Sequence, residues 1–149
     1  MSGVNLDMEQ FLIAADKRIP NLSGLKFNCT DLYEYQRCLR ACDGKFDIPF
    51  GVDEFLPAAL ALGAKSAVGS TYNYAAPHFH EIIADFNNGD IEKVNRGMDN
   101  VIELIRVLVD FGGVAAGKVA MALHDINAGN PRLPLTLSLI HISEPTRHT

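Results

Sequence analysis

Short apolar runs alternate with helical patterns through the first half of the chain, and this alternation limits the folds that the chain can adopt. The runs cover residues 22–27, 46–50 and 66–68, and a polar turn and then a helical pattern follow each of them. Strands that alternate with helices form parallel sheets, because each crossover helix returns the chain to the same end of the sheet. We therefore expect an α/β fold in which helices cover three short parallel strands.

Helical periodicity predicts a series of helices in which apolar residues recur three or four positions apart. Glycine and proline mark several of the predicted ends. Three strands are too few for a closed (β/α)₈ barrel, which takes about 250 residues, so we expect the chain to be one part of a larger fold. The predicted helices cover residues 7–18, 31–42, 54–62, 76–86, 91–111 and 114–123.

The composition argues against several classes of protein. A net charge of −5 and a pI near 5.4 disfavour a surface that binds nucleic acid or anionic membrane. No stretch approaches the ~20 apolar residues of a membrane span, and the first ten residues lack the pattern of a secretory signal. Cys29, Cys38 and Cys42 have no CxxC spacing, so we expect reduced structural cysteines in a cytoplasmic protein.

Three polar clusters directly follow the apolar runs. Lys26 and Asn28 lie at the end of the first run, residues 51–54 follow the second, and residues 69–73 follow the third. In parallel α/β folds the carboxyl ends of the strands meet at one edge, where loops and helix N-termini converge on substrates. We therefore expect the three clusters to contribute to one binding site.

Lys26 is the candidate nucleophile of this site. Leu25 and Phe27 flank it, so its amine could lie in a partly apolar cavity. Desolvation there would disfavour the ammonium form and favour the neutral amine that attacks a carbonyl. The alternative is a lysine at a strand end whose ammonium reaches solvent, and position alone leaves both interpretations open.

The second and third clusters offer hydrogen bonds to a ligand. The carboxylates of Asp53 and Glu54 are strong acceptors for substrate hydroxyls. Acidic residues also favour the first turn of a helix, so a helix cap is the alternative interpretation of this pair. Gly69 and Ser70 combine a close backbone approach with a hydroxyl, although this turn sequence is common and weak by itself.

Three other patterns do not support a site. Residues 112–118 have the spacing of a phosphate-binding loop, but they follow a predicted helix, and Val119 replaces the required Ser or Thr. His78 and His80 are two positions apart, which places them on different sides of a helix with no third ligand nearby. No serine lies in a Gly-x-Ser-x-Gly elbow, so a serine hydrolase finds no support.

Taken together and in order, these clusters resemble the N-acetylneuraminate lyases, or sialic acid aldolases, of the dihydrodipicolinate synthase/N-acetylneuraminate lyase family. The combination of a Gly-x-Asp-Glu loop with a Gly-Ser-Thr-Tyr-Asn loop is typical of the lyases, and the likeness points most to their animal branch. The resemblance runs from about Gly3 to Leu135. The matching stretches are Ile19–Phe27, Phe50–Glu54, Ala67–Tyr74 and Pro131–Leu135.

The resemblance implies the C-terminal part of a (β/α)₈ TIM barrel, its last three strands followed by helices, in a homotetramer that uses no metal or organic cofactor. Lys26 would form a Schiff base with the keto group of open-chain sialic acid, which is cleaved to pyruvate and N-acetylmannosamine. Asn28 would lie near the pyruvoyl carboxylate, where relatives often carry Ser or Thr. The residues implied to hold the sugar hydroxyls are Gly51, Asp53, Glu54, Gly69 and Ser70.

Two motifs of the family do not occur in this chain. The carboxylate-binding Gly-Thr-Thr-Gly-Glu loop and the proton-shuttling tyrosine belong to strands that would precede Gly3. We therefore expect residues 1–135 to be a C-terminal half that is inactive alone. Residues 136–149 resemble the translation of a sequencing-library adapter, and we expect them to be a disordered, artefactual tail.

Two other interpretations stay open beside the lyase. The chain could be a non-catalytic half-barrel that binds another protein chain through its open sheet edge. It could also belong to an aldolase that uses the same lysine chemistry on another 2-keto-3-deoxy acid. Comparing the cleavage of N-acetylneuraminate with that of shorter 2-keto acids distinguishes the two enzymes, and a folded chain without activity favours the binding module.

Overall fold

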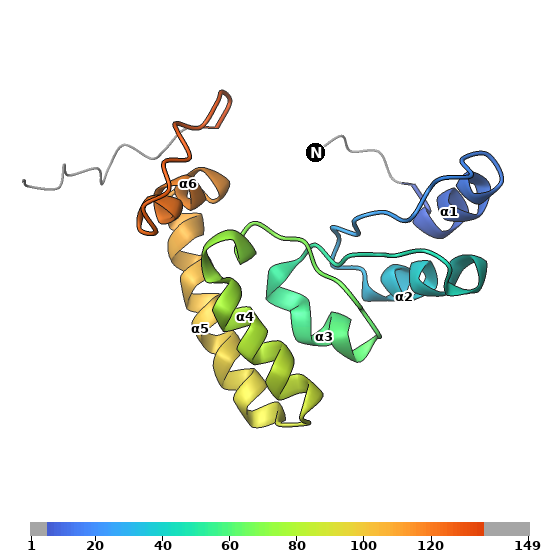
Figure 1. Ribbon diagram of the computed structural model, residues 1–149, viewed down its shortest axis with the longest axis horizontal. Coiled ribbons are helices and arrows are strands. Elements are labelled where there is room, and N and C mark those ends of the chain that lie inside the picture. Colours follow the sequence, from blue (N-terminus) through green and yellow to red (C-terminus); the bar gives the residue numbers. More distant parts are fainter. Residues whose placement is uncertain (1–5, 136–149) are drawn as a thin grey trace, which may run out of the picture.

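The computed structural model describes residues 6–135; the expected tail at 136–149 and residues 1–5 lie outside the described residues. Helices make up most of the described chain (Figure 1). There are also two short 3₁₀ segments: Ala41–Gly44 directly follows α2, and Asp53–Phe55 directly precedes α3. The helices are α1 (Met8–Asp16), α2 (Leu32–Arg40), α3 (Leu56–Ala61), α4 (Tyr72–Asn87), α5 (Ile91–Asp110) and α6 (Val114–Ala122).

Side-chain caps explain why three of the six described helices begin within one residue of the predicted start. The side chains of Asp7, Asp31 and Asp90 accept hydrogen bonds from backbone N–H groups three residues later, at the starts of α1, α2 and α5. Helix α2 ends two residues before its predicted end, because Cys42 and Asp43 adopt left-handed conformations with φ of 51° and 59°.

Helix α4 begins before the predicted start at Ala76, but its backbone is not helical at Ala75 (φ −130°), so the prediction matches the start of the helix after this kink. The helix begins at Tyr72, four residues earlier. Thr71 precedes this first turn, and its backbone N–H donates to the Asp53 carboxylate at 3.1 Å. Asp53 lies in a different loop, so a local pattern cannot show that it supplies the acceptor for this helix end.

The three expected strands are wrong as continuous strands, although their parallel order is confirmed. The apolar runs pair at isolated positions only: Gly24 with Asp47, Phe27 with Phe50, and Phe50 with Ala67. The middle run therefore lies between the other two. Pro49 has no N–H to donate, which limits the ladder that this short run can form. The parallel pairing still brings the three carboxyl ends to one edge.

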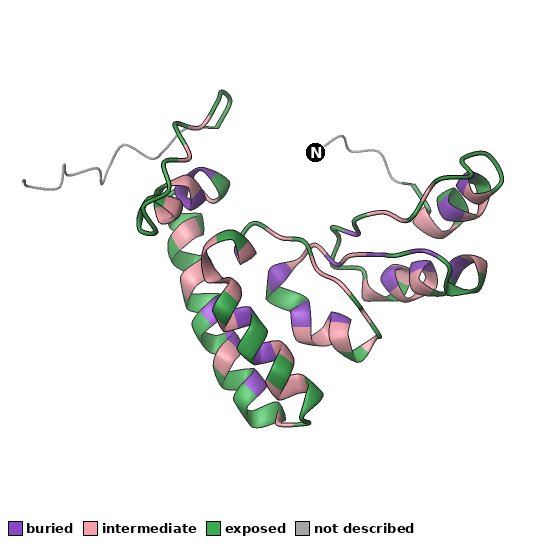
Figure 2. Ribbon diagram, viewed as in Figure 1, coloured by how far each residue is buried: buried purple, intermediate pink, exposed green. Residues whose placement is uncertain are grey.

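Two apolar clusters stabilise the fold on either side of these runs. The first joins α1 and α2 to the first two runs, and its cysteine, Cys38, is buried, which raises the pKa of the thiol to about 11. The second joins α3, α4 and α5, and Figure 2 shows buried residues where α4 and α5 face each other. The larger members are Leu12, Phe27, Tyr35, Ile48 and Phe50 in the first cluster, and Leu56, Phe79, Ile82, Val94 and Val101 in the second.

Helix α5 extends past its contact with α4 and reaches α6. Gly97 allows α5 to approach α4, because a Cβ there would lie 2.7 Å from Cγ1 of Ile82. Helix α6 packs against both helices and buries Ala115, Ala116 and Gly117. Within residues 6–135, no helix combines the length and the apolar character that crossing a membrane requires. The three cysteines carry free thiols, as the sequence predicts.

We predict that Tyr35→Phe lowers the free energy of unfolding by about 1–2 kcal/mol. The Tyr35 hydroxyl is buried and donates to the carbonyl of Ile48 at 3.0 Å, so its removal leaves that carbonyl without its partner. Urea unfolding of the variant beside the parent protein measures the change. Tyr33→Phe is the matched control, because the Tyr33 side chain is exposed. Equal stability of the two variants would contradict the prediction.

Candidate functional site

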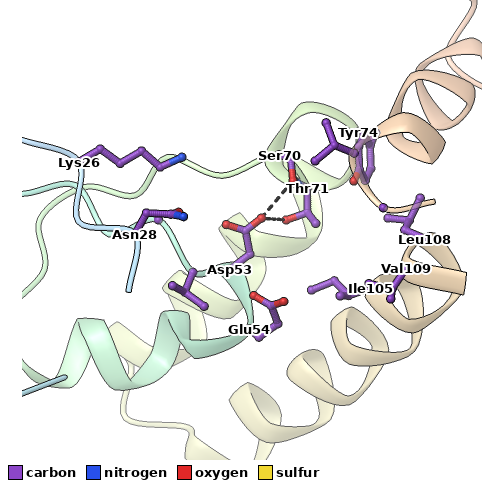
Figure 3. Close-up of a pocket in the computed structure, with 14 residues that line it drawn as sticks. Lys26, Asn28, Asp53, Glu54, Ser70, Thr71, Tyr74, Ile105, Leu108 and Val109 are labelled. Atoms are coloured by element: carbon purple, nitrogen blue, oxygen red, sulfur yellow. Dashed lines mark hydrogen bonds between the residues drawn. The ribbon is translucent and has the colours of Figure 1, made fainter. Parts of the chain in front are cut away.

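The three polar clusters line one cavity of about 450 Å³ at the carboxyl ends of the apolar runs (Figure 3). This confirms the expectation that parallel pairing brings them together. Gly69 does not face the cavity itself, and it lies directly behind the Asp53 carboxylate. The predicted residues that line the cavity are Lys26, Asn28, Gly51, Asp53, Glu54 and Ser70.

Gly51 gives the side chains of Lys26 and Asn28 the room that they occupy. A Cβ at Gly51 would lie 2.6 Å from Cε of Lys26 and 2.5 Å from Oδ1 of Asn28. Both contacts are shorter than real Cβ atoms show, so any larger residue would displace the two side chains. Gly51 also donates its N–H to the carbonyl of Phe27 at 2.8 Å, which fixes the backbone between the first two clusters.

Of the two interpretations left open for Lys26, the described residues fit the one in which its ammonium reaches solvent, because Lys26 is exposed. Side chains alternate between the two faces of an extended segment. Phe27 accordingly points away from Lys26 into the first apolar cluster, where it is buried. No hydrogen bond or ion pair to the Lys26 ammonium forms within residues 6–135. The amine is therefore accessible from the cavity.

Asp53 connects the second polar cluster to the third. Its carboxylate is 5% exposed, and Oδ2 accepts from both the backbone N–H and the hydroxyl of Thr71 (Figure 3). Asp53 and Glu54 lie in the first turn of the 3₁₀ segment before α3, as the helix-cap interpretation expects, but no side-chain cap bond forms at the start of that segment or of α3. The second oxygen, Oδ1, has no partner in the described part of the chain. One carboxylate oxygen thus holds the loops together, while the other is buried against Gly69.

Gly69 allows Asp53 to take this position. A Cβ at Gly69 would lie 1.5 Å from Oδ1 of Asp53, which is far inside any real contact. The sequence predicts a close backbone approach at this glycine, and the structure confirms it with a side chain of the same protein as the approaching group. Ser70, the next residue, is exposed and lines the cavity.

The cavity also has an apolar wall that the sequence analysis did not assign to the site. Ile105, Leu108 and Val109 of α5 and Val114 of α6 form it, opposite the polar clusters. Ile105 and Leu108 belong to the apolar stripe of a predicted helix, and such a stripe normally indicates core packing. The apolar stripe of α5 continues beyond the part of the helix that packs on α4, and this extra length is the signal that could have indicated a role in the site for its last turns.

Two tyrosines, Tyr72 in the third cluster and Tyr74 just after it, received no role in the sequence analysis. Tyr74 lines the cavity, and burial raises the pKa of its phenol, as does the nearby Asp53 charge; a hydrogen bond with Ser70 acts in the opposite direction. The pKa of Tyr72 is raised mainly by burial, then by Asp53 and Glu54. The Tyr72 hydroxyl is buried without a partner in the described chain.

The patterns set aside in the sequence form no competing site. Within residues 6–135, no three His, Cys, Asp or Glu side chains lie close enough to hold a metal ion. Residues 112–118 follow a helix, α5, and the Lys118 ammonium donates to the carbonyl of Ala128 at 2.7 Å. A ring nitrogen of His78 lies 3.0 Å from the carbonyl oxygen of Gly97, where α4 meets α5.

The chemistry of the cavity suits a polar carbonyl compound. A primary amine and an amide lie at one end, carboxylate and hydroxyl oxygens lie in the middle, and a phenol and apolar side chains lie at the other end (Figure 3). An amine can add to a carbonyl carbon, and carboxylates accept hydrogen bonds from hydroxyl groups. Such an arrangement can bind a hydroxylated chain and react with a carbonyl group at its near end.

The sequence matches one known protein family and relatives that belong to it. A sequence model of the dihydrodipicolinate synthetase family matches residues 1–143. The N-acetylneuraminate lyase of Rattus norvegicus is 36% identical over 138 residues, which cover 91% of this chain and 43% of the rat protein. The chain therefore spans less than half the length of this relative.

Solved structures agree with this match. The N-acetylneuraminate lyase (sialic acid aldolase) of Aliivibrio salmonicida is 80% identical with a TM-score of 0.89, covering 93% of this chain and 47% of that one. The Fusobacterium nucleatum lyase, solved in complex with pyruvate, is 28% identical with a TM-score of 0.76, covering 90% and 45%. The likeness to the animal branch is thus a wrong expectation, since the identity to the Aliivibrio chain is far higher than to the rat protein.

We predict that Gly69→Ala costs about 2–4 kcal/mol of stability, because its Cβ must displace Asp53 and break both bonds to Thr71. In an Asp53→Ala background the obstructing carboxylate is absent, so the same change should cost much less. Urea unfolding of the two single variants and the double variant gives the coupling energy, which should exceed about 1 kcal/mol. Additive costs would show that Gly69 and Asp53 do not interact.

Proposed function

Because the chain belongs to the dihydrodipicolinate synthetase family, we propose that it is the C-terminal half of an N-acetylneuraminate lyase. This enzyme is a class I aldolase that cleaves N-acetylneuraminate to pyruvate and N-acetylmannosamine. The observation that carries the proposal is the single cavity in which the Lys26 amine faces the carboxylates of the second cluster and the hydroxyl of the third. The names of the Aliivibrio and rat relatives supply the substrate.

Lys26 is the proposed catalytic residue. Its neutral amine adds to the keto carbon of the open-chain sugar acid, and loss of water gives an imine. The protonated imine accepts the electron pair of the bond between the third and fourth carbons when that bond breaks. The fourth carbon becomes the aldehyde of N-acetylmannosamine as its hydroxyl loses a proton. The enamine left on Lys26 then takes up a proton and is hydrolysed to pyruvate and free lysine, so no cofactor takes part.

The remaining predicted residues are proposed to hold the substrate. The exposed carboxylate of Glu54 is placed to accept from sugar hydroxyls, and Ser70 adds a hydroxyl beside it. Asp53 also lines the cavity, and its carboxylate is proposed to accept from a sugar hydroxyl once a shift of the loop uncovers the buried Oδ1. Asn28 is proposed to lie near the carboxylate of the pyruvoyl group. Gly51 and Gly69 contribute through the space that they leave for Lys26, Asn28 and Asp53, besides any backbone contact to the sugar.

The full site is proposed to need a second half. The chain spans 43–47% of the rat and Aliivibrio proteins, and the family's proton-shuttling tyrosine and carboxylate-binding loop are absent from its sequence. These groups would complete a (β/α)₈ barrel and cover the Lys26 amine. We therefore expect the chain to be inactive alone. The complete enzyme is proposed to be a cytoplasmic homotetramer, and analytical ultracentrifugation tests the assembly.

Trapping with borohydride tests the role of Lys26. The protein for the test is a chimeric lyase in which residues 1–135 follow the N-terminal half of the Aliivibrio salmonicida enzyme. We expect pyruvate and sodium borohydride to leave a reduced adduct on Lys26, which peptide mass spectrometry locates. Lys26→Arg should abolish both the adduct and cleavage, because a guanidinium stays protonated and cannot form the imine.

Lys65→Arg is the matched control for this experiment. Lys65 lines a separate hollow near the start of the third apolar run, so its replacement should leave the adduct intact. An unmodified Lys26 in an otherwise folded chimera would overturn the proposed function. An adduct without cleavage of N-acetylneuraminate, but with cleavage of a shorter 2-keto-3-deoxy acid, would change the substrate and keep the chemistry.

We predict that Glu54→Gln raises the KM of the chimeric lyase for N-acetylneuraminate by about tenfold or more, because a charge-assisted hydrogen bond becomes a neutral one. Pyruvate has no sugar hydroxyls to bind, so trapping of pyruvate on Lys26 should not change. Steady-state cleavage and the trapping assay measure the two effects. Glu103→Gln, a surface carboxylate paired with Arg106 on α5, is the control. An unchanged KM would remove Glu54 from the substrate contacts.

A further inference from the structure

Tyr74 occupies the end of the cavity opposite to Lys26 (Figure 3). It lies in the first turn of α4, directly after the Ser70 and Thr71 pair that the third polar cluster contributes. The side chain is half-buried, and it stands beside the apolar wall that α5 and α6 form. A ligand bound to Lys26 would reach this phenol only with the part furthest from its carbonyl carbon.

The phenol is suited to donate a hydrogen bond at this end. Burial and the Asp53 charge raise the pKa of Tyr74, so the group keeps its proton at neutral pH. The neighbouring wall consists of Ile105, Leu108 and Val109, which offer no hydrogen-bonding side chain. Beside this apolar wall, the phenol and the Ser70 hydroxyl with which it hydrogen-bonds are polar groups that can fix the orientation of a ligand.

Helix α6 holds the ring of Tyr74 in place through a glycine. A Cβ at Gly117 would lie 3.2 Å from Cε1 and 3.5 Å from the hydroxyl oxygen of Tyr74. Glycine is a poor helix former, yet Gly117 stands in the middle of α6 and is buried there. A ring nitrogen of His124 lies 3.2 Å from the backbone carbonyl oxygen of Tyr74, which adds a second contact between α4 and the segment after α6.

We propose that Tyr74 determines specificity by contacting the end of the substrate furthest from the keto carbon, and that Gly117 is the positioning residue that sets its ring. This inference rests on the proposed function, because it assumes that the substrate is bound through Lys26. It adds a contact outside the three polar clusters. The substrate class that it selects is a long hydroxylated 2-keto acid, since a short one would not extend to Tyr74.

Tyr74→Phe in the chimeric lyase tests the contact. The change removes the hydroxyl and keeps the ring, so KM for N-acetylneuraminate should rise about three- to tenfold, as expected for one lost hydrogen bond. The turnover number should change less than twofold, and pyruvate trapping on Lys26 should be unaffected. Tyr33→Phe is the matched control, because the Tyr33 side chain is exposed and outside the cavity.

Gly117→Ala tests the positioning role. The change favours the helix and therefore should not lower the unfolding temperature, but its methyl group must push the Tyr74 ring. We expect KM for N-acetylneuraminate to rise while pyruvate trapping stays the same. The double variant with Tyr74→Phe should be no worse than Gly117→Ala alone. Val119→Ala on the exposed side of α6 is the control, since it also favours the helix and does not touch Tyr74.

The possible outcomes separate the role of Tyr74, the role of Gly117 and the proposed function. A raised KM with normal trapping supports the role of Tyr74, and trapping by the variants also proves that their active site has folded. A Tyr74→Phe enzyme with unchanged KM overturns this inference and leaves the proposed function intact. Independent effects of the two substitutions overturn the role of Gly117 alone. Absence of any Lys26 adduct in the parent chimera overturns the proposed function and this inference with it.

Discussion

The buried carboxylate of Asp53 is the interaction on which the rest of the site depends. It comes from the loop after the second apolar run and bonds twice to Thr71 after the third. The hydrogen-bond ladder between the runs is short, so it cannot by itself fix how their following loops approach each other. The two bonds from Asp53 supply that constraint, and Gly69 provides the space that the carboxylate needs.

The same carboxylate sets the start of α4, and the cavity follows from that. With its first turn held at Thr71, α4 begins early enough to place Tyr74 beside Ser70. Helix α5 packs along α4 through the second apolar cluster, and its last turns extend beyond α4 to form the apolar wall. The polar and apolar sides of the site are therefore positioned by connected contacts, which run from Asp53 through Thr71 and α4 to α5.

Sequence patterns predicted the parts of this arrangement that are determined locally. Helix α2 begins within one residue of its predicted start, where Asp31 caps it, and the order of the apolar runs placed three polar clusters at one edge. The start of α4 was missed because its acceptor lies in Asp53, in another loop. The sequence left open whether Lys26 is shielded or exposed; it is exposed, because neighbours in an extended segment face opposite sides and Phe27 therefore turns away from it.

Asp53 also carries a carboxylate oxygen that does not contribute to joining the loops. A buried carboxylate oxygen without a hydrogen bond costs folding free energy, on the order of 1–3 kcal/mol for an unsatisfied polar group. Oδ2 alone would suffice to join the loops, and an amide or a hydroxyl at this position could do so at lower cost. Oδ1 lies against Gly69 with no exposed surface, so a ligand hydroxyl can reach it only when the loop that holds Gly69 moves aside. The unpaired oxygen therefore indicates that a movement of this loop would let Asp53 bond to a ligand as well as to Thr71.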